Sequence, residues 1–211
     1  DLPDDPRDAC RAIREDRLHA LIHPEVGMAS PALLLAALRA APVQAVAWGH
    51  PITTGLPSID LFLTSDRMEP EDGEEQVTES LVRLPGLSIT VAPPPEPTTR
   101  TRADFGLPED GPLFLVPQSL FKLLPSGDDV YARILARVPD ASIAFLRNSS
   151  PTVSGLFERR LHAACRARGV DPTGRIHLLP KLDWRDYLAL NRVADVFLDG
   201  LTWSGGMTTL E

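Results

Sequence analysis

A cluster of prolines near the middle of the chain is the feature that most constrains its fold. Residues 92–102 read APPPEPTTRTR. Neither a central strand nor the interior of a helix tolerates such a cluster, because proline lacks a backbone N–H and fixes φ. We therefore expect an interdomain linker at residues 92–104, between a first domain at residues 1–91 and a second at residues 105–211.

On both sides of the linker, short apolar runs alternate with helix-like segments. The run Val43–Ala47 is typical of a buried strand. In the second domain we expect strands at residues 113–117 and Ser142–Leu146, with a helix at Asp128–Arg137 between them. Strands that alternate with helices form parallel sheets through right-handed crossovers. The sequence thus predicts an α/β fold of two Rossmann-like lobes, whose parallel sheets face across a cleft.

One helix of the first domain has a recognisable start. Ser30 and Pro31 come before a segment rich in leucine and alanine at residues 32–39. Serine is a favoured N-cap, and proline is favoured at the first helical position. We therefore expect Ser30 to cap a helix that packs on the first sheet.

Composition and charge restrict the partners of the chain. Of its 211 residues 43% are hydrophobic, enough to bury a core, and its net charge is −8. Such an acidic balance argues against a nucleic-acid binder and against an anionic membrane surface, since both attract basic faces. No apolar run approaches the ~20 residues of a membrane helix. The distant Cys10 and Cys165 suggest neither a disulfide framework nor a zinc site, so a cytoplasmic protein is expected.

Polar loops follow two expected strands of the first domain. Residues 48–55 read WGHPITTG and come directly after Val43–Ala47, while His23 and Glu25 follow a shorter apolar run. Such loops lie at the carboxyl ends of parallel strands, where open α/β sheets bind ligands. An ordinary strand-to-helix connection and solvated loop residues remain the alternative interpretations.

Two loops of the second domain have the chemistry of a phosphate site. Lys122 follows the first strand and is a compact cation suited to a diphosphate. Thr208 and Thr209 offer hydroxyl donors in a glycine-rich turn that opens a helix, and helix N-termini bind phosphate. Glu211, just beyond, could accept from ribose hydroxyls. A surface lysine and a helix cap are the alternatives for each alone; together the residues predict a nucleotide-diphosphate cleft between lobes.

Eight short segments, in chain order, resemble the bacterial form of the O-linked N-acetylglucosamine transferase/SPINDLY family. The resemblance covers nearly the whole chain. The segments are APVQ (41–44), GHPITTG (49–55), DLFLTS (60–65), LP (84–85), FKLLP (121–125), ILARVP (134–139), ADVFLD (194–199) and SGGMTTLE (204–211).

This resemblance implies a GT-B fold, a UDP-sugar donor and an inverting transfer to a protein side chain, with N-acetylglucosamine as the favoured sugar. Residues 1–91 would be the C-terminal part of the first lobe, and residues 105–211 an incomplete UDP-binding lobe. In the family, tetratricopeptide repeats usually precede the catalytic region, and this sequence contains none. Its acidic start and its stop at Glu211, inside an expected helix, also predict a piece of a larger protein.

The resemblance also implies roles for individual residues. Lys122 would stabilise the departing UDP, and Lys181 would approach the uracil. Two positions depart from the eukaryotic members: a glutamine common three residues before the lysine is Ser119 here, with Gln118 one earlier, and His50 stands where they have tyrosine. Gly206, Thr208 and Thr209 would contact the phosphates. Gly49, Thr53 and Thr54 would line the sugar end, and Glu211 would contact the ribose.

The expected chemistry is the loss of a diphosphate from an anomeric carbon. No Asp-x-Asp metal motif occurs in the sequence, so we expect no metal cofactor, with Lys122 and the Gly206–Thr209 turn supplying the electrostatics. His50 is a candidate general base because an imidazole side chain is suited to accept a proton near neutral pH, and Glu25 is a second. Alternatives are an HMW1C-like N-glycosyltransferase using a UDP-hexose, a UDP-sugar epimerase and a non-catalytic nucleotide-binding scaffold.

Overall fold

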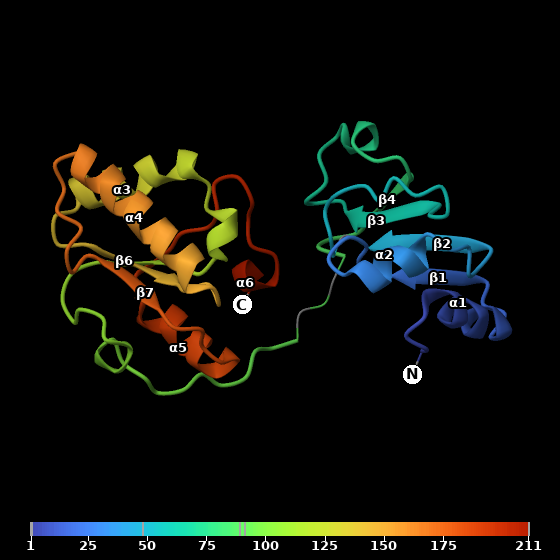
Figure 1. Ribbon diagram of the computed structural model, residues 1–211, viewed down its shortest axis with the longest axis horizontal. Helices are drawn as coiled ribbons and strands as arrows, with labels where there is room; N and C mark the ends of the chain where they lie inside the picture. The colour runs from blue at the N-terminus through green and yellow to red at the C-terminus, as the bar shows by residue number, and fades with distance from the viewer. Residues whose placement is uncertain (1, 48, 89, 91, 211) are drawn as a thin grey trace. The chain divides into compact units, whose positions relative to one another are not determined.

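The computed structural model describes residues 2–47, 49–88, 90 and 92–210. The chain divides into two compact units, residues 1–90 and residues 91–211, each of which is described by itself (Figure 1). Among the described residues, every strand pairing in both units is parallel. The α/β class and the parallel sheets predicted from the sequence are therefore confirmed.

The first unit is a four-stranded sheet whose strands follow one another in chain order, β1-β2-β3-β4. Buried residues of β2, β3 and α2 form one cluster around Val46 and Phe62, and Cys10 and Ile13 of α1 form a second with Ala40. The elements are α1 (Pro6–Glu15), β1 (Ala20–His23), α2 (Ser30–Ala36), β2 (Val43–Ala47), β3 (Leu61–Ser65), the 3-10 turn η1 (Gly73–Glu75) and β4 (Ser80–Leu84).

The two helices of this unit begin in different ways. At α1 the Asp5 carboxylate accepts hydrogen bonds from the backbone N–H groups of Arg7 and Asp8, at 2.8 and 3.2 Å. Helix α2 includes Ser30 as its first residue, and Ala29 takes the cap position with no side-chain hydrogen bond. The predicted Ser30 cap is wrong, because the first helical turn also tolerates proline one position further in.

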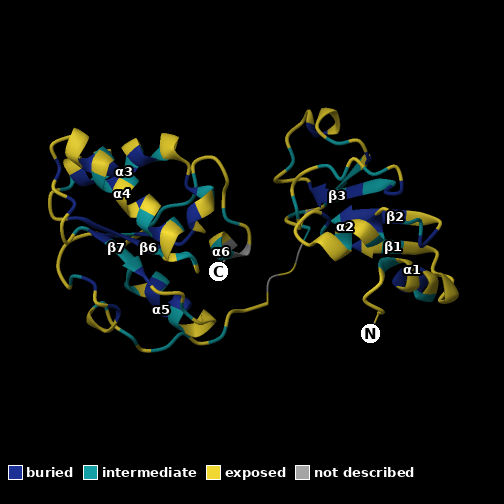
Figure 2. Cartoon of the chain, in the orientation of Figure 1, coloured by how far each residue is buried: buried dark blue, intermediate teal, exposed yellow. Residues whose placement is uncertain are grey.

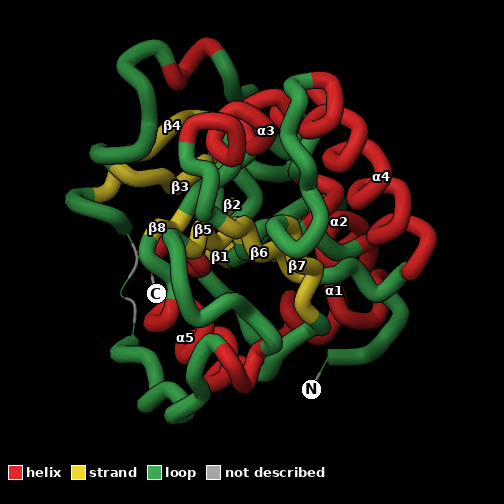
Figure 3. The backbone as a smooth tube through the Cα atoms, turned by 90° about the vertical axis from the view of Figure 1, so that its left-hand side faces the viewer, coloured by secondary structure: helices red, strands yellow, loops and turns green. Residues whose placement is uncertain are grey.

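The second unit is a four-stranded parallel sheet in the order β7-β6-β5-β8, which can be followed across Figure 3. Its elements are η2 (Ala103–Phe105), β5 (Leu113–Val116), η3 (Leu120–Lys122), η4 (Pro125–Gly127), α3 (Asp128–Arg137), β6 (Ser142–Leu146), α4 (Pro151–Ala167), β7 (Ile176–Leu179), α5 (Trp184–Val193), β8 (Val196–Phe197) and α6 (Met207–Leu210).

Helices cover both faces of this second sheet. Helices α3 and α4 lie on one face and α5 on the other, and Figure 2 shows the buried residues gathered along the strands between them. Because side chains alternate along a strand, Ile143 and Phe145 of β6 pack with α3 and α4, while Ala144 packs with Leu190 of α5. The interior is therefore two apolar layers separated by the sheet.

The strand order places a topological switch point at β5. The chain runs from β5 to β6 and β7 in one direction, then returns to place β8 on the other side of β5. In open α/β sheets the crevice outside the carboxyl ends of strands at such a point is where ligands bind. The loops after β5 and β8 therefore occupy the position expected of a ligand site.

Part of the proline- and threonine-rich segment is hydrogen-bonded to α5. Asp186 accepts hydrogen bonds from the hydroxyl of Thr98 and from the guanidinium of Arg100, both at 2.7 Å. Arg185 donates to the backbone carbonyl of Glu96 at 2.8 Å. The bonds from Thr98 and Arg100 hold the pKa of Asp186 below its usual value. The role of residues 92–104 as an interdomain linker stays a prediction.

Candidate functional site

Two polar side chains meet at the switch point of the second sheet. Gln118 lies two residues beyond β5 and is only 3% exposed. Its amide Nε2 donates a hydrogen bond of 3.2 Å to Oδ1 of Asp199, which lies two residues beyond β8. This bond joins the loops that follow two adjacent parallel strands.

Asp199 is the centre of a larger group of hydrogen bonds. Partial burial would raise the pKa of its carboxyl, but the bonds that it accepts outweigh burial and lower that pKa. Asp199 is therefore a carboxylate at neutral pH and fixes the shape of residues 199–205. Its donors are Gln118 Nε2 (3.2 Å), Gly200 N (2.7 Å), Ser204 Oγ (2.6 Å), Gly205 N (2.8 Å) and Thr209 Oγ1 (3.4 Å), and we call these residues with Asp199 the Asp199 cluster.

Polar atoms crowd around Gly205. A Cβ at this position would lie 2.3 Å from Thr209 Oγ1, 2.4 Å from Gln118 Nε2 and 2.7 Å from Thr208 Oγ1. A Cβ at the neighbouring Gly206 would meet nothing within 4 Å. Thr208 and Thr209, which were expected at the phosphates together with Gly206, thus lie around Gly205 with Gln118 beside them.

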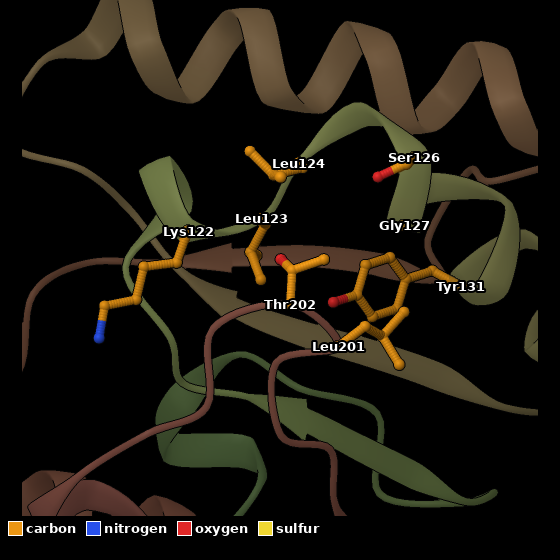
Figure 4. Close-up of a pocket in the computed structure, with 8 residues that line it drawn as sticks. All are labelled: Lys122, Leu123, Leu124, Ser126, Gly127, Tyr131, Leu201 and Thr202. Carbon is orange, nitrogen blue, oxygen red and sulfur yellow. The ribbon is translucent and has the colours of Figure 1, made fainter. Parts of the chain in front are cut away.

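Lys122 lies beside the same loop. It ends the short turn η3 and lines a hollow of ≈140 Å³ together with Leu201 and Thr202, which belong to the loop after β8. Figure 4 shows its side chain extending from the turn, with the ammonium pointing away from Leu124 and Tyr131. Within the described part of the chain, no carboxylate forms an ion pair with Lys122.

Of the two other contacts expected of this unit, only Lys181 is among the described residues. Lys181 is exposed and follows β7, the edge strand of the sheet. The segment after it leads into α5, whose Tyr187 hydroxyl donates to the backbone carbonyl of Thr208 at 3.3 Å. Glu211, expected at the ribose, lies outside the described residues, as does Trp48 in the first unit.

In the first unit, the loops after β1 and β2 pack against each other. A Cβ at Gly49 would lie 2.4 Å from the carbonyl oxygen of Pro24 and 3.0 Å from the Cβ of Glu25, so only glycine fits there. The His50 ring lies 3.4 Å from where a Cβ on Gly27 would be. Glu25 accepts a 2.8 Å hydrogen bond from a backbone N–H of its own loop. Gly49, His50 and Glu25 therefore share one surface region, as their positions after adjacent strands predict.

The hydroxyls of Thr53 and Thr54 are bound to an acid that sequence reasoning missed. Glu79, 7% exposed, accepts from Thr53 Oγ1 at 2.7 Å, from Thr54 N at 2.8 Å and from the Thr54 hydroxyl. Burial would raise the pKa of Glu79, but these bonds lower it overall. The only signal in the sequence is an acidic residue just before β4. A role for the two threonines at the sugar stays a prediction.

Two features are absent from the described residues. No three His, Cys, Asp or Glu side chains of this part of the chain are grouped so that they could hold a metal ion. In the same residues, no helix has the length and apolarity to cross a bilayer.

The two parallel α/β units, with a polar site at the switch point of the second, define the GT-B class of fold. The computed structure matches that of an O-GlcNAc transferase from Thermobaculum terrenum, a lysine-to-methionine mutant, with a TM-score of 0.81 and 28% identity. The match covers 97% of this chain and 38% of that one. A pneumococcal O-GlcNAc transferase, GtfA, solved with UDP and GlcNAc, shares the fold at a TM-score of 0.50 and 15% identity.

The sequence gives the family. Over 210 residues the chain is 30% identical to a protein of Arabidopsis thaliana named probable UDP-N-acetylglucosamine–peptide N-acetylglucosaminyltransferase SPINDLY. No protein-family model matches the chain. The alignment covers 98% of this chain but 22% of that relative, so the chain spans about a fifth of the relative's length. The resemblance to the O-linked N-acetylglucosamine transferase/SPINDLY family is thereby confirmed.

Proposed function

We propose that this chain is part of an inverting glycosyltransferase that moves N-acetylglucosamine from a UDP-sugar to serine or threonine hydroxyls of proteins. The observation that supports this most is the Asp199 cluster, which joins the loops after β5 and β8 beside Lys122. A position at the switch point, beside the ammonium of Lys122, suits a diphosphate. The family resemblance then supplies the sugar and the type of acceptor.

The proposed chemistry needs positive charge where UDP departs. Lys122 is assigned to the developing negative charge on the diphosphate, and Gly206, Thr208 and Thr209 to the phosphate oxygens through N–H and hydroxyl groups. Preorganised donors of this kind lower the barrier because they need no reorganisation during the reaction. With an ammonium in this role, we propose that transfer proceeds without a metal cofactor.

The remaining contacts are assigned by the resemblance. Gln118 contributes to the diphosphate site, Lys181 to the uracil and Glu211 to the ribose. The loop with Gly49, Thr53 and Thr54 contributes to the sugar end, with the two threonines acting through the loop shape that Glu79 sets. His50 and Glu25 are the candidates for the general base that deprotonates the acceptor hydroxyl.

The proposed setting of the reaction is the cytoplasm, with a protein or peptide as acceptor and no nucleic acid or membrane as partner. The net charge of −8 supports this, since it disfavours polyanionic surfaces. Tetratricopeptide repeats are proposed elsewhere in the full-length protein, where they would bind acceptors.

The test is transfer by the full-length protein from UDP-N-acetylglucosamine to a peptide, read by mass spectrometry. Lys122→Ala should lower the rate by about 10²–10³, the usual loss of one preorganised donor, whereas Arg159→Ala, an exposed cation on α4, should leave it unchanged. Addition of EDTA should have no effect. Strict dependence on Mg²⁺ would contradict the metal-free part of the proposal, and a hexose on asparagine would indicate an HMW1C-like activity instead.

A further inference from the structure

Arg160 on α4 binds the turn that contains Lys122. Its Nη2 donates a 2.6 Å hydrogen bond to the carbonyl oxygen of Leu123, the residue directly after Lys122. Inside the turn, Lys122 N donates to Ser119 O at 2.9 Å and Leu123 N to Leu120 O at 3.2 Å. Such 3-10 bonds have poor geometry, so the bond from Arg160 is an important external support of this turn.

A buried acid at the start of α3 orients Arg160. The Nε of Arg160 donates to Asp128 Oδ2 at 2.6 Å, and its guanidinium lies 5.3 Å from the centre of the Phe157 ring. The Asp128 side chain is 6% exposed, and its Oδ1 has no hydrogen-bond partner among the described residues. Burial raises the pKa of Asp128, although Arg160 opposes the shift. The ion pair and the ring contact thus fix the guanidinium, and its second donor, Nη2, reaches Leu123.

The Asp128–Arg160 ion pair is expected to add little to the free energy of unfolding. A buried ion pair is often replaceable by apolar residues without loss, because desolvation of the two charges offsets their attraction. The unpartnered Oδ1 of Asp128 adds to that cost. A planar guanidinium with several donors does, however, fix direction well. The pair therefore suits a role in positioning the chain more than a role in stabilising the fold.

The ion pair also lies close to the hollow at Lys122. Tyr131, three residues after Asp128 on α3, lines this hollow together with Lys122 and Leu201 (Figure 4). Burial raises the pKa of Tyr131, and the charge of Asp128 adds to the increase. The start of α3 thus contacts both the support of the Lys122 turn and the wall of the hollow.

We propose that Arg160, oriented by Asp128, is a positioning residue that holds the Lys122 turn so that the ammonium meets a nucleoside diphosphate. The inference rests on the proposed function, because that function assigns the diphosphate to Lys122. Without Arg160 the turn keeps its buried anchors, Leu120 and Leu123, but its end is released and the direction of the ammonium is no longer fixed. The consequence is weaker binding by a folded protein.

The experiment is a double-mutant cycle on UDP binding by the full-length protein, measured by calorimetry. Arg160→Met should weaken UDP binding about tenfold, within the range that misplacement of a binding group produces. Lys122→Ala should also weaken it. In the Lys122→Ala background, Arg160→Met should cause no further loss, since residues that act through one another are not additive.

Each outcome of the cycle decides a separate question. If Arg160→Met weakens binding equally in both backgrounds, or does not weaken it at all, the positioning role is wrong while the proposed function stands. If Lys122→Ala leaves UDP affinity unchanged, the assignment of the diphosphate to Lys122 fails, and the inference fails with it.

Controls separate positioning from general damage. Arg159→Met changes the adjacent exposed arginine and should leave UDP affinity unchanged. Arg160→Lys, which keeps the positive charge on a single donor nitrogen, should recover part of the loss. Should circular dichroism show that Arg160→Met is unfolded, Asp128→Asn takes its place in the cycle. It removes the charge that orients Arg160 and should show the same dependence on Lys122; additive losses there would overturn the inference.

Discussion

Gln118 and Asp199, 81 residues apart in sequence, share a 3.2 Å hydrogen bond between the amide Nε2 and the carboxylate Oδ1. The bond links the ends of β5 and β8, the two strands that flank the switch point. Because Asp199 also accepts from the backbone of Gly200 and Gly205, the position of Gln118 and the shape of the glycine-rich loop depend on each other. A substitution of Gln118 should therefore alter the glycine-rich loop, and a substitution in the loop should alter the position of Gln118.

Replacing Gln118 with glutamate tests this dependence. Gln118→Glu would set a second carboxylate against Asp199 in a partly buried site, and like charges at this distance repel each other. We expect UDP affinity, measured by calorimetry, to fall by about tenfold or more. Gln76→Glu, at an exposed position after η1, makes the same change in total charge and should have no effect. Equal effects of the two variants would show that total charge, not the contact, matters.

Alanine substitutions of Gly205 and of its neighbour Gly206 form a matched pair of variants. In Gly205→Ala the new Cβ would approach the side-chain ends of Gln118, Thr208 and Thr209 within 2.7 Å, whereas in Gly206→Ala it would meet nothing. Flexible side-chain ends can move, so we expect thermal stability to change little in either variant. UDP affinity should fall further in Gly205→Ala than in Gly206→Ala, because only a Cβ at Gly205 would displace polar side chains. Equal affinities of the two variants would show that the polar groups around Gly205 do not contribute to UDP binding.

Apolar periodicity predicted the elements that place these groups. The strands Val43–Ala47 and Ser142–Leu146 and the helix Asp128–Arg137 have in the structure the bounds expected from sequence. Once the strands are parallel, the loops after them must lie at one edge of the sheet. That is why Gln118 and Thr209, far apart in sequence, could be expected to lie together.

Hydrogen-bond acceptors were harder to predict. Asp199 stands in a segment quoted for the family resemblance, yet a carboxylate at a strand end has the same signature whether it binds a ligand or organises its own loop. Thr53 and Thr54 are predicted at a sugar, and nothing in the sequence indicated that their hydroxyls bind Glu79. A threonine hydroxyl can bond to many different groups. Here its partner, Glu79, is about 25 residues away in the sequence, so no local sequence pattern indicates the bond.

Glu79 should matter for stability more than its place in the sequence suggests. Glu79→Gln keeps the size of the side chain but replaces one carboxylate oxygen with an amide donor, so either the Thr53 hydroxyl or Thr54 N loses its acceptor. A buried group left without its partner costs about 1–3 kcal/mol, and we expect urea denaturation to show a loss of this size in the unfolding of the first unit. Glu75→Gln, at an exposed position in η1, should change nothing. An equal midpoint for both variants would show that the Glu79 bonds add no net stability.

His23 should make the stability of the first unit depend on pH. Its side chain lies at the end of β1, is 6% exposed, and its Nε2 has no partner among the described residues. Burial lowers its pKa below the ordinary value of 6.5. The unfolded chain therefore binds the proton more readily than the folded one, so stability is complete above pH 6.5 and falls as the pH drops below it, by at most about 1.4 kcal/mol per pH unit for one group.

The measurement that checks this is urea denaturation of the protein and of His23→Gln at several pH values between about 5 and 8. Glutamine cannot be protonated, so the fall in stability of the first unit below pH 6.5 should become shallower in this variant. His19→Gln, at an exposed position before β1, should keep the slope of the parent protein. If His23→Gln also keeps that slope, other groups account for the acid sensitivity and the buried imidazole contributes nothing to it.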